Sequence, residues 1–308
     1  MNTPQHTLHI VCISDGRPGH DTQSEGLAAA IARIVPAKIT HTPARGWLRN
    51  LRSLASGKVW RDMGNIDLVI GAGHGTHLSL LSAKRELSCP AIVLMSPSLP
   101  LSLFDLCVIP QHDGQTDRPN VIQTLGAITT LEPRTDHIGE IGLILIGGPS
   151  NHYGWDEPLL LNQIREIVKR SDHRWYLTNS PRTPTATSRQ LKELAGERLH
   201  YQAHERVSRD WIIDRLQQAP AVWVSRDSIS MICESLSIGA PTGLLEVPEK
   251  PNCKLRQTTE TLLERHLLKT FQQWQQGQPL SAPDEPLQEA TRVAGEIVQR
   301  LSLSTPGP

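Results

Sequence analysis

Residues 221–248 read AVWVSRDSISMICESLSIGAPTGLLEVP, the pattern of a strand, a polar turn, a helix and a second strand. The apolar run Ala221–Val224 is typical of a buried parallel strand. Apolar residues then recur at helical spacing, and Asp227 or Ser228 can cap the first turn of that helix. Gly239 and the proline two residues later end it. We therefore expect one strand-helix-strand unit of a parallel sheet here.

Ser230 and Glu234 lie four residues apart, on one face of the expected helix. Backbone N–H groups and the helix dipole favour anions at a helix N-terminus. A carboxylate one turn further along can accept two hydrogen bonds from a ribose diol while the N-terminus holds phosphates. The alternative interpretation is that Glu234 is a solvated carboxylate on an ordinary helix of a parallel sheet.

The composition of the 308-residue chain limits the classes of protein to consider, and the length is enough for two ordinary domains. Lys plus Arg and Asp plus Glu number 31 each, so no overall charge favours nucleic acid as a partner. The five cysteines include no CxxC pair, which favours buried thiols in a reducing compartment over disulfides or a zinc site. No secretory signal or membrane-spanning run is recognisable, so we expect a cytoplasmic protein.

A glycine-rich loop follows the first apolar strand, Leu8–Ile13. Residues 14–20 read SDGRPGH and lead into a helix over about residues 21–35. The spacing is not the GxGxxG fingerprint, which argues against an NAD enzyme. His20 can act as a general base near neutral pH, and Asp15 can transfer a proton itself or orient His20. Alternatively, His20 is a loop histidine that is hydrogen-bonded to the backbone.

A second glycine-rich loop, GAGHGTH at residues 71–77, follows the expected strand Ile66–Ile70. Its glycines allow a substrate to approach the backbone, and its two histidines raise the question of a metal. Because no third ligand is nearby, we expect polar contacts to an acceptor or simple hydrogen bonds, and no metal. His112, beside Asp113 after a further strand, is interpreted as a contact at the rim of the site.

Residues 44–62, ARGWLRNLRSLASGKVWRD, form a basic amphipathic element. Its apolar residues share one helical face, and its basic residues meet no acidic residue before Asp62. Such an element can lie on an anionic membrane surface or meet a lipid-linked acceptor. The alternative is a packed helix with a solvated basic face.

A polar, proline-containing segment at residues 131–137 is expected to separate two domains, residues 1–134 and residues 135–308. Both halves repeat strands, helices and glycine-rich loops, which indicates parallel sheets with ligands at their carboxyl edges. The end of the chain has helical spacing of apolar residues over residues 254–276 and 284–301.

The second domain opens with the apolar strand Ile141–Ile146 and the loop GGPSN. The N–H groups and the hydroxyl of such a loop can surround a diphosphate. After the next strand, Arg182 lies where its guanidinium can bind a phosphate. The alternative interpretation is an exposed loop arginine with no ligand.

Several of these segments resemble motifs of GT-B glycosyltransferases, especially the transferase that adds N-acetylglucosamine to the peptidoglycan lipid precursor. In that group a Glu is followed five residues later by Gly and seven later by Pro, as Glu234 is here by Gly239 and Pro241. The resemblance implies an α/β chain of two Rossmann-like domains that face each other across a cleft. Residues 1–134 would bind the acceptor and residues 135–308 the nucleotide-sugar donor, with the last helix crossing back to the first domain.

The same resemblance implies roles for individual residues. Glu234 would bind the nucleotide ribose, and His20 or Asp15 would deprotonate the acceptor. The other donor-binding candidates belong to loops and a helix N-terminus of the second domain: Gly147, Gly148, Ser150, Arg182, Arg226, Ser228 and Ser230. The acceptor-side candidates belong to loops of the first domain: Gly19, Gly73, His74, Thr76 and His112. GT-B enzymes need no bound metal, so we expect no cofactor beyond the nucleotide-sugar co-substrate.

Six motifs in order also resemble the Elongated-Mitochondria family of fission factors and its bacterial relatives. They are SDGRPGH at 14–20, GAGHGTH at 71–77, PQHD at 110–113, GGPS at 147–150, SPRT at 180–183 and SRDSISMICE at 225–234. The bacterial members are regarded as candidate glycosyltransferases, some of them tied to surface polysaccharide. The plant members promote mitochondrial division by recruiting a dynamin-related protein.

Two functions of different classes follow from these resemblances. The first is a metal-independent glycosyltransferase that moves a sugar from a nucleotide-sugar to a surface-glycan or lipid-linked acceptor. The second is a non-catalytic interaction protein of the fission factor family, with residues 45–61 in peripheral contact with a membrane. Because no organelle-targeting signal is recognisable, we favour a bacterial cytoplasmic protein, with the inner membrane face as the place of any such contact.

Overall fold

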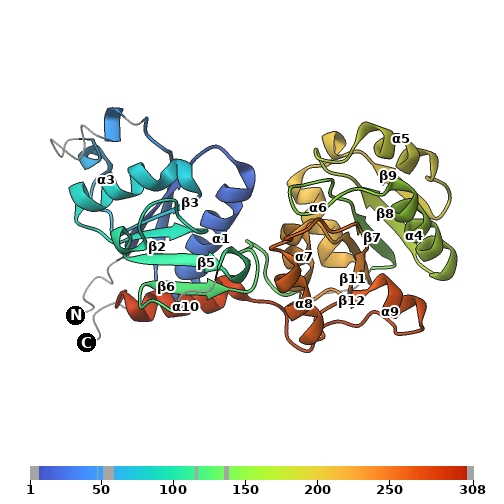
Figure 1. Cartoon of the computed structure of the whole chain (residues 1–308). Coiled ribbons are helices and arrows are strands. Elements are labelled where there is room, and N and C mark those ends of the chain that lie inside the picture. The colour runs from blue at the N-terminus through green and yellow to red at the C-terminus, as the bar shows by residue number, and fades with distance from the viewer. Residues whose placement is uncertain (1–6, 47, 51–58, 115–116, 135–138, 304–308) are drawn as a thin grey trace. The chain divides into compact units, whose positions relative to one another are not determined.

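The computed structural model describes residues 7–46, 48–50, 59–114, 117–134 and 139–303. The chain forms two compact units, one of residues 1–130 with 288–308 and one of residues 131–287 (Figure 1). Each unit is built on a six-stranded parallel sheet with helices, so the predicted α/β class is confirmed. Of the basic element predicted at 44–62, residues 47 and 51–58 lie outside the described residues.

The first unit has the strand order β2-β1-β3-β4-β5-β6. Its strands are β1 (Leu8–Ser14), β2 (Ala37–Pro43), β3 (Leu68–Ala72), β4 (Ala91–Leu94), β5 (Leu106–Pro110) and β6 (Val121–Thr124). Its helices are α1 (Pro18–Ile34), α3 (His77–Leu87) and α10 (Glu289–Arg300). Short 3-10 turns lie at Arg61–Met63, His74–Thr76, Leu101–Leu103 and Gln111–Asp113.

The core of the first unit lies on both faces of its sheet. Strands β3, β4 and β5 are buried along their whole length, which is why each is a continuous apolar run. Helices α1 and α10 cover one face and α3 covers the other (Figure 1). Because Val293 and Ile297 of α10 are buried in the same cluster as Leu27 and Ile31 of α1, the end of the chain completes this core.

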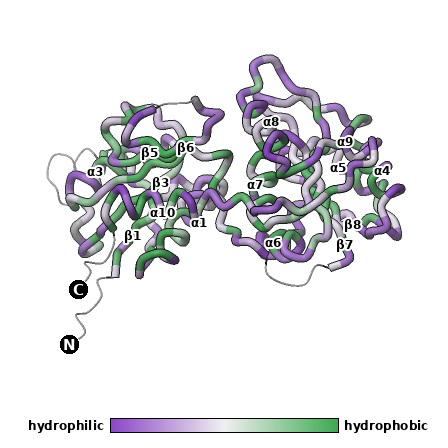
Figure 2. The backbone as a smooth tube through the Cα atoms, turned by 90° about the horizontal axis from the view of Figure 1, so that it is seen from below, coloured by the Kyte–Doolittle hydropathy of each residue, from purple (hydrophilic) through white to green (hydrophobic). Residues whose placement is uncertain are grey.

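The second unit has the strand order β12-β11-β10-β7-β8-β9. Its strands are β7 (Ile141–Leu145), β8 (Arg174–Thr178), β9 (Leu199–Gln202), β10 (Val222–Ser225), β11 (Thr242–Leu245) and β12 (Lys269–Thr270). Its helices are α4 (Glu157–Arg170), α5 (Thr185–Glu193), α6 (Arg209–Gln218), α7 (Ile229–Ser237), α8 (Arg256–Glu264) and α9 (Phe271–Gln275), with a 3-10 turn at His204–Arg206. Figure 2 shows how polar and apolar residues are distributed along the chain.

Strand order fixes where ligands bind in such sheets. In the second unit, counting β7 to β12 as one to six, the order is 3-2-1-4-5-6, and the switch point lies between β7 and β10. In the first unit the order is 2-1-3-4-5-6, and the switch point lies between β1 and β3. At these two places the loops after neighbouring strands part in opposite directions and leave a crevice at the carboxyl edge.

The structure corrects several sequence-based boundaries. The strand expected at 66–70 is β3, which begins and ends two residues later. The edge strand β2 was not predicted, because its side chains are partly exposed and many are polar, so its sequence contains no apolar run. The helical pattern over residues 254–276 is not one helix. The backbone turns left-handed at His266, with φ of 57°, and β12 then joins the sheet before α9 begins.

The boundary between the units lies between Thr130 and Leu131, so residues 131–134 belong to the second unit and not to the first. Arg134 explains this. Its N–H donates to Ile238 O at 3.1 Å, and its guanidinium donates to the backbone carbonyls of Ala219 at 2.7 Å and Gly239 at 3.4 Å. Within the described residues, no helix is both long enough and apolar enough to cross a membrane.

Candidate functional site

The switch point of the second sheet brings three loops together. Gly147 and Gly148 follow β7, and Arg182 lies in the loop after β8. Ser225 ends β10, and Asp227 lies in the turn that follows it. Because all three strands are parallel, these residues lie at one edge of the sheet.

Asp227 holds these loops together. Its carboxylate is completely buried, and Oδ2 accepts hydrogen bonds from Gly148 N–H and from Arg182 Nη2, both at 2.9 Å. Arg182 Nη1 also donates to Gly148 O at 2.7 Å. A Cβ at Gly147 would lie 2.2 Å from Asp227 Oδ2, so only glycine allows the carboxylate this close.

Several predicted donor-binding groups have partners inside the chain. Gly147 N–H donates to Ser225 Oγ at 2.7 Å, in addition to the Gly148 bond described above. Ser150 Oγ accepts the N–H groups of His152 and Tyr153, both at 3.1 Å. Arg226 forms ion pairs with Glu246 at 3.1 Å and Glu249 at 3.3 Å. These groups therefore shape the loops around the switch point.

The N-terminus of α7 is different, because Ser228 occupies the capping position but its side chain accepts no capping hydrogen bond. The first-turn N–H groups of a helix need a partner, and an uncapped start at a switch point favours a bound anion. Ser228 is buried and Ser230 is exposed. The structure therefore confirms that α7 begins after Ser228, and it shows no side-chain cap there.

Glu234 lies one turn further along α7 and is buried, not solvated. Arg209 Nη2 approaches Glu234 Oε1 to 2.7 Å, and this guanidinium offsets the cost of burying the carboxylate. Arg209 opens α6, 25 residues before Glu234, and no local sequence pattern connects the two. Sequence reasoning missed Arg209 for that reason.

In the first unit, the loops after β1 and β3 meet at the other switch point. His20 Nδ1 lies 2.9 Å from Asp15 Oδ2, and both side chains are largely buried. Gly73, with φ of 77°, packs so closely that a Cβ there would lie 2.3 Å from His20 Cε1. A Cβ at Gly75 would lie 2.8 Å from Asp15 Cβ. The two glycine-rich motifs thus build one cluster around Asp15 and His20.

This pairing has a chemical consequence. When the imidazole is neutral and its Nδ1–H donates to the Asp15 carboxylate, Nε2 is left as the basic nitrogen. A carboxylate in this position fixes the tautomer and stabilises the imidazolium that forms after proton uptake. The arrangement can therefore act as a general base.

The other acceptor-side candidates differ in their surroundings. Thr76 is buried and its hydroxyl donates to Gly73 O at 2.8 Å, so it stabilises the loop. His74 and Gly19 are exposed beside the cluster. His112 follows β5, and β3 and β4 lie between β5 and β1. Three strand spacings therefore place the end of β5 about 14 Å from the end of β1 along the sheet edge. The structure does not bring His112 together with His20.

The two histidines of the GAGHGTH motif differ in exposure, because His74 is exposed and His77 is buried. His77 packs edge-on against Phe104, and burial lowers the pKa of its imidazole. Among the described residues, no group of three or more His, Cys, Asp or Glu side chains is arranged to hold a metal ion.

Comparison with solved structures identifies the fold. UDP-GlcNAc 2-epimerase from Neisseria meningitidis, solved with UDP-GlcNAc bound, is 10% identical, with a TM-score of 0.61 over 97% of this chain and 100% of that chain. A glycosyltransferase from Rickettsia africae is 10% identical, with a TM-score of 0.51 over 96% of this chain and 89% of that chain. These similarities, together with the two Rossmann-like sheets, show the GT-B fold.

Comparison of sequences identifies the family. An uncharacterised protein of Rickettsia prowazekii is 21% identical over 290 residues, covering 77% of this chain and 80% of that protein. The sequence model described as "Mitochondrial fission ELM1" matches residues 18–301, which include the six motifs except for the first residues of SDGRPGH. The chain therefore belongs to the mitochondrial fission ELM1 family.

Proposed function

We propose that this chain is a nucleotide-sugar-dependent glycosyltransferase that transfers a sugar to a surface-glycan or lipid-linked acceptor. The observation that carries the proposal is the position of Glu234, buried one turn beyond the uncapped N-terminus of α7 at a switch point. This spacing suits a nucleotide, because a ribose diol donates to the carboxylate while the helix N-terminus holds the diphosphate.

The charges of the second unit suit a sugar diphosphate. Asp227 already offsets one positive charge on Arg182, so we assign the larger part of the diphosphate interaction to the α7 N-terminus. Arg182 remains 42% exposed and has guanidinium donors left for a phosphate oxygen. The likeness to an epimerase solved with UDP-GlcNAc supports a UDP-sugar as the donor.

The first unit supplies the proposed base. His20 Nε2 takes the proton of an acceptor hydroxyl, and Asp15 stabilises the resulting imidazolium. The acceptor oxygen then forms the new bond to the sugar as the bond to the diphosphate breaks. The nucleoside diphosphate leaves with the electron pair, and its added charge is stabilised by the helix N-terminus and Arg182.

A product assay tests the reaction class. We expect the protein to release nucleoside diphosphate from one sugar nucleotide in the presence of a membrane-lipid or glycan extract, and to label that extract with the sugar. His20→Asn keeps a hydrogen-bonding side chain in place of the base and is expected to lower the rate by about 100-fold or more. Conversion of the sugar with no labelled acceptor would instead indicate an epimerase.

Family membership favours a second candidate, a non-catalytic interaction protein that works at a membrane. This alternative predicts that purified protein binds anionic vesicles and that binding survives Glu234→Ala. Charge reversal at both Arg49 and Arg52 of the basic element should abolish vesicle binding. A protein that neither binds sugar nucleotides nor vesicles would contradict both candidates.

A further inference from the structure

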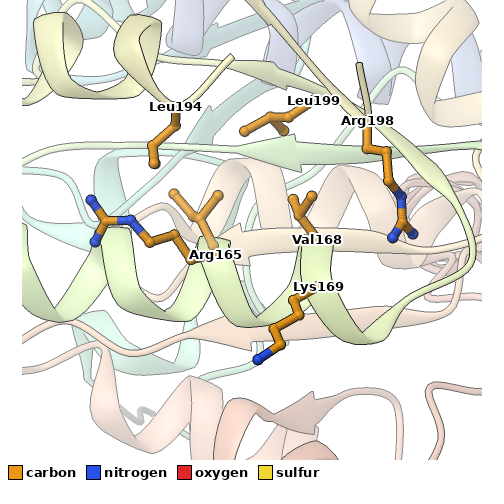
Figure 3. Close-up of a pocket in the computed structure, with 7 residues that line it drawn as sticks. Arg165, Val168, Lys169, Leu194, Arg198 and Leu199 are labelled. Carbon is orange, nitrogen blue, oxygen red and sulfur yellow. The ribbon is translucent and has the colours of Figure 1, made fainter. Parts of the chain in front are cut away.

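A pocket lies on the second unit, away from the switch point. It has a volume of about 270 Å³ and is formed by α4, the end of α5 and the start of β9 (Figure 3). Leu199 is the first residue of β9, and Lys169 belongs to the last turn of α4, which precedes β8. The pocket is therefore near the amino ends of the strands, whereas the donor-site candidates lie at the carboxyl ends.

The floor of the pocket is apolar. Ile164 is fully buried and Leu199 nearly so, while Val168 and Leu194 are partly exposed and line its walls. A pocket of this volume with an aliphatic floor can accommodate one or two bulky apolar side chains of a ligand.

The rim of the pocket is basic. All three charged lining residues, Arg165, Lys169 and Arg198, are cationic. Arg165 donates to the neutral Asn162 Oδ1 at 2.9 Å, and Arg198 donates to the backbone carbonyls of Ser171 and His173. No carboxylate of the described residues forms an ion pair with these three cations.

The sequence of α4 makes this absence informative. Arg165 and Lys169 are like charges four residues apart on one helix face, a pairing that destabilises a helix slightly. On the same helix Glu166 pairs with Arg170 at 2.9 Å, and it interacts with Lys169 electrostatically without forming an ion-pair contact. An anion at the pocket rim would relieve the repulsion between Arg165 and Lys169.

We propose that this pocket binds an acidic segment of a partner protein, in which one bulky aliphatic side chain is flanked by carboxylates. The guanidinium groups of Arg165 and Arg198 lie at opposite ends of the pocket, with Val168 and Leu199 between them (Figure 3). A single small anion reaches one end only, whereas a peptide with carboxylates on both sides of an apolar anchor reaches both. Charge complementarity around an apolar centre is the usual arrangement of a small protein interface.

Fluorescence anisotropy with a labelled peptide, Glu-Glu-Leu-Glu-Glu, tests the proposal on the full chain. We expect a dissociation constant of about 10–100 µM that weakens with added salt, as for a small transient interface. The double variant Arg165→Glu and Lys169→Glu should weaken binding by about tenfold or more. The matched control is Arg189→Glu and Lys192→Glu, which makes the same charge change at exposed positions of α5 outside the pocket.

Further arms distinguish the ligand classes. Replacing the central leucine of the peptide by serine should cost about fivefold or more in affinity, because the apolar floor loses its partner. Equal loss in the pocket variant and the control variant would overturn the proposal in favour of general charge attraction. Tight binding of laurate without peptide binding would overturn the proposal and assign the pocket to a lipid anion. If millimolar inorganic phosphate displaces the leucine and serine peptides equally well, the pocket is a simple anion site and the proposal is also overturned. Thermal melting verifies that each variant is folded.

Discussion

Arg209 Nη2 lies 2.7 Å from Glu234 Oε1, so the carboxylate at the centre of the proposed donor site is held by a guanidinium from another helix. Glu234 is buried and Arg209 is 40% exposed, so the pair is open to solvent on the arginine side. Glu234 is thus positioned before any ligand binds, which lowers the cost of ordering it on binding.

The first prediction concerns this pair. Arg209→Ala should weaken nucleotide binding by about three- to tenfold, because the carboxylate loses its orientation and its charge partner. Arg209→Lys should restore part of the affinity, since a single ammonium replaces the guanidinium less well. The measurement is calorimetric titration with the preferred nucleotide and its 2′-deoxy form. If Arg209→Ala leaves the preference for the ribose form unchanged, Arg209 does not position Glu234.

The second prediction concerns Asp227. Asp227→Asn should lower the free energy of unfolding by about 2 kcal/mol, because the buried carboxylate ties Gly148 N–H to Arg182. The value is below that for a fully buried pair, since Arg182 is 42% exposed. Urea unfolding measures it, with the exposed Asp214→Asn on α6 as the matched control. Equal effects of the two substitutions would show that Asp227 does not hold the loops together.

The third prediction compares two glycines with nearly the same φ. At Gly73, with φ of 77°, a Cβ would lie 2.3 Å from His20 Cε1, whereas at Gly64, with φ of 78°, a Cβ would have nothing within 4 Å. Gly64→Ala should cost about 1 kcal/mol of stability from backbone strain alone. At Gly73, where ψ is 164°, alanine combines an unfavourable backbone conformation with a clash against the imidazole, and it should cost about 2–3 kcal/mol and displace His20. Urea unfolding and the histidine NMR signals measure the two effects, and equal costs would contradict the packing described here.

The fourth prediction concerns thiol reactivity. Burial raises the pKa of Cys12 to about 12 and those of Cys89 and Cys107 to about 11, and Cys233 is also buried. Thiolate is the reactive form, so these thiols should react slowly at pH 8, and the fraction ionised should become substantial only near pH 11–12. Cys253, which is partly exposed, should react first. A disulfide reagent should show one fast thiol that Cys253→Ser removes; several fast thiols would contradict the packing.

The sequence predicted the parts of the fold that depend on local pattern. Residues 221–248 form the expected strand, helix and strand because an apolar run, a polar turn and helical spacing occur within one short span. The edge strand β2 was missed because its side chains are partly exposed and polar, which gives no apolar run. The division at Leu131 depends on hydrogen bonds from Arg134 to residues 85–105 positions away, which no local pattern contains.

The candidate site also contains residues that local sequence pattern predicts and residues that it does not. Asp15 and His20 are five residues apart in the SDGRPGH motif that the sequence singled out, and the structure pairs them although His20 lies in the first turn of α1. Arg209 was missed, and Asp227 was considered only as a helix cap, because their partners are brought close by the sheet and not by the chain. Residue type and strand-end position can be read from sequence, whereas the internal partners of Gly148 and Arg226 require the folded structure.

The most direct test of the proposed donor site is calorimetric titration of the purified chain with UDP, GDP, ADP and CMP and their common sugar conjugates. The proposal predicts micromolar binding of one sugar nucleotide, reduced about ten- to a hundredfold by Glu234→Ala. The exposed Glu197→Ala, in the turn before β9, should bind as the unaltered protein does. Absence of binding to every nucleotide, or binding that Glu234→Ala leaves unchanged, would contradict the assignment of Glu234 and the α7 N-terminus to a nucleotide-sugar.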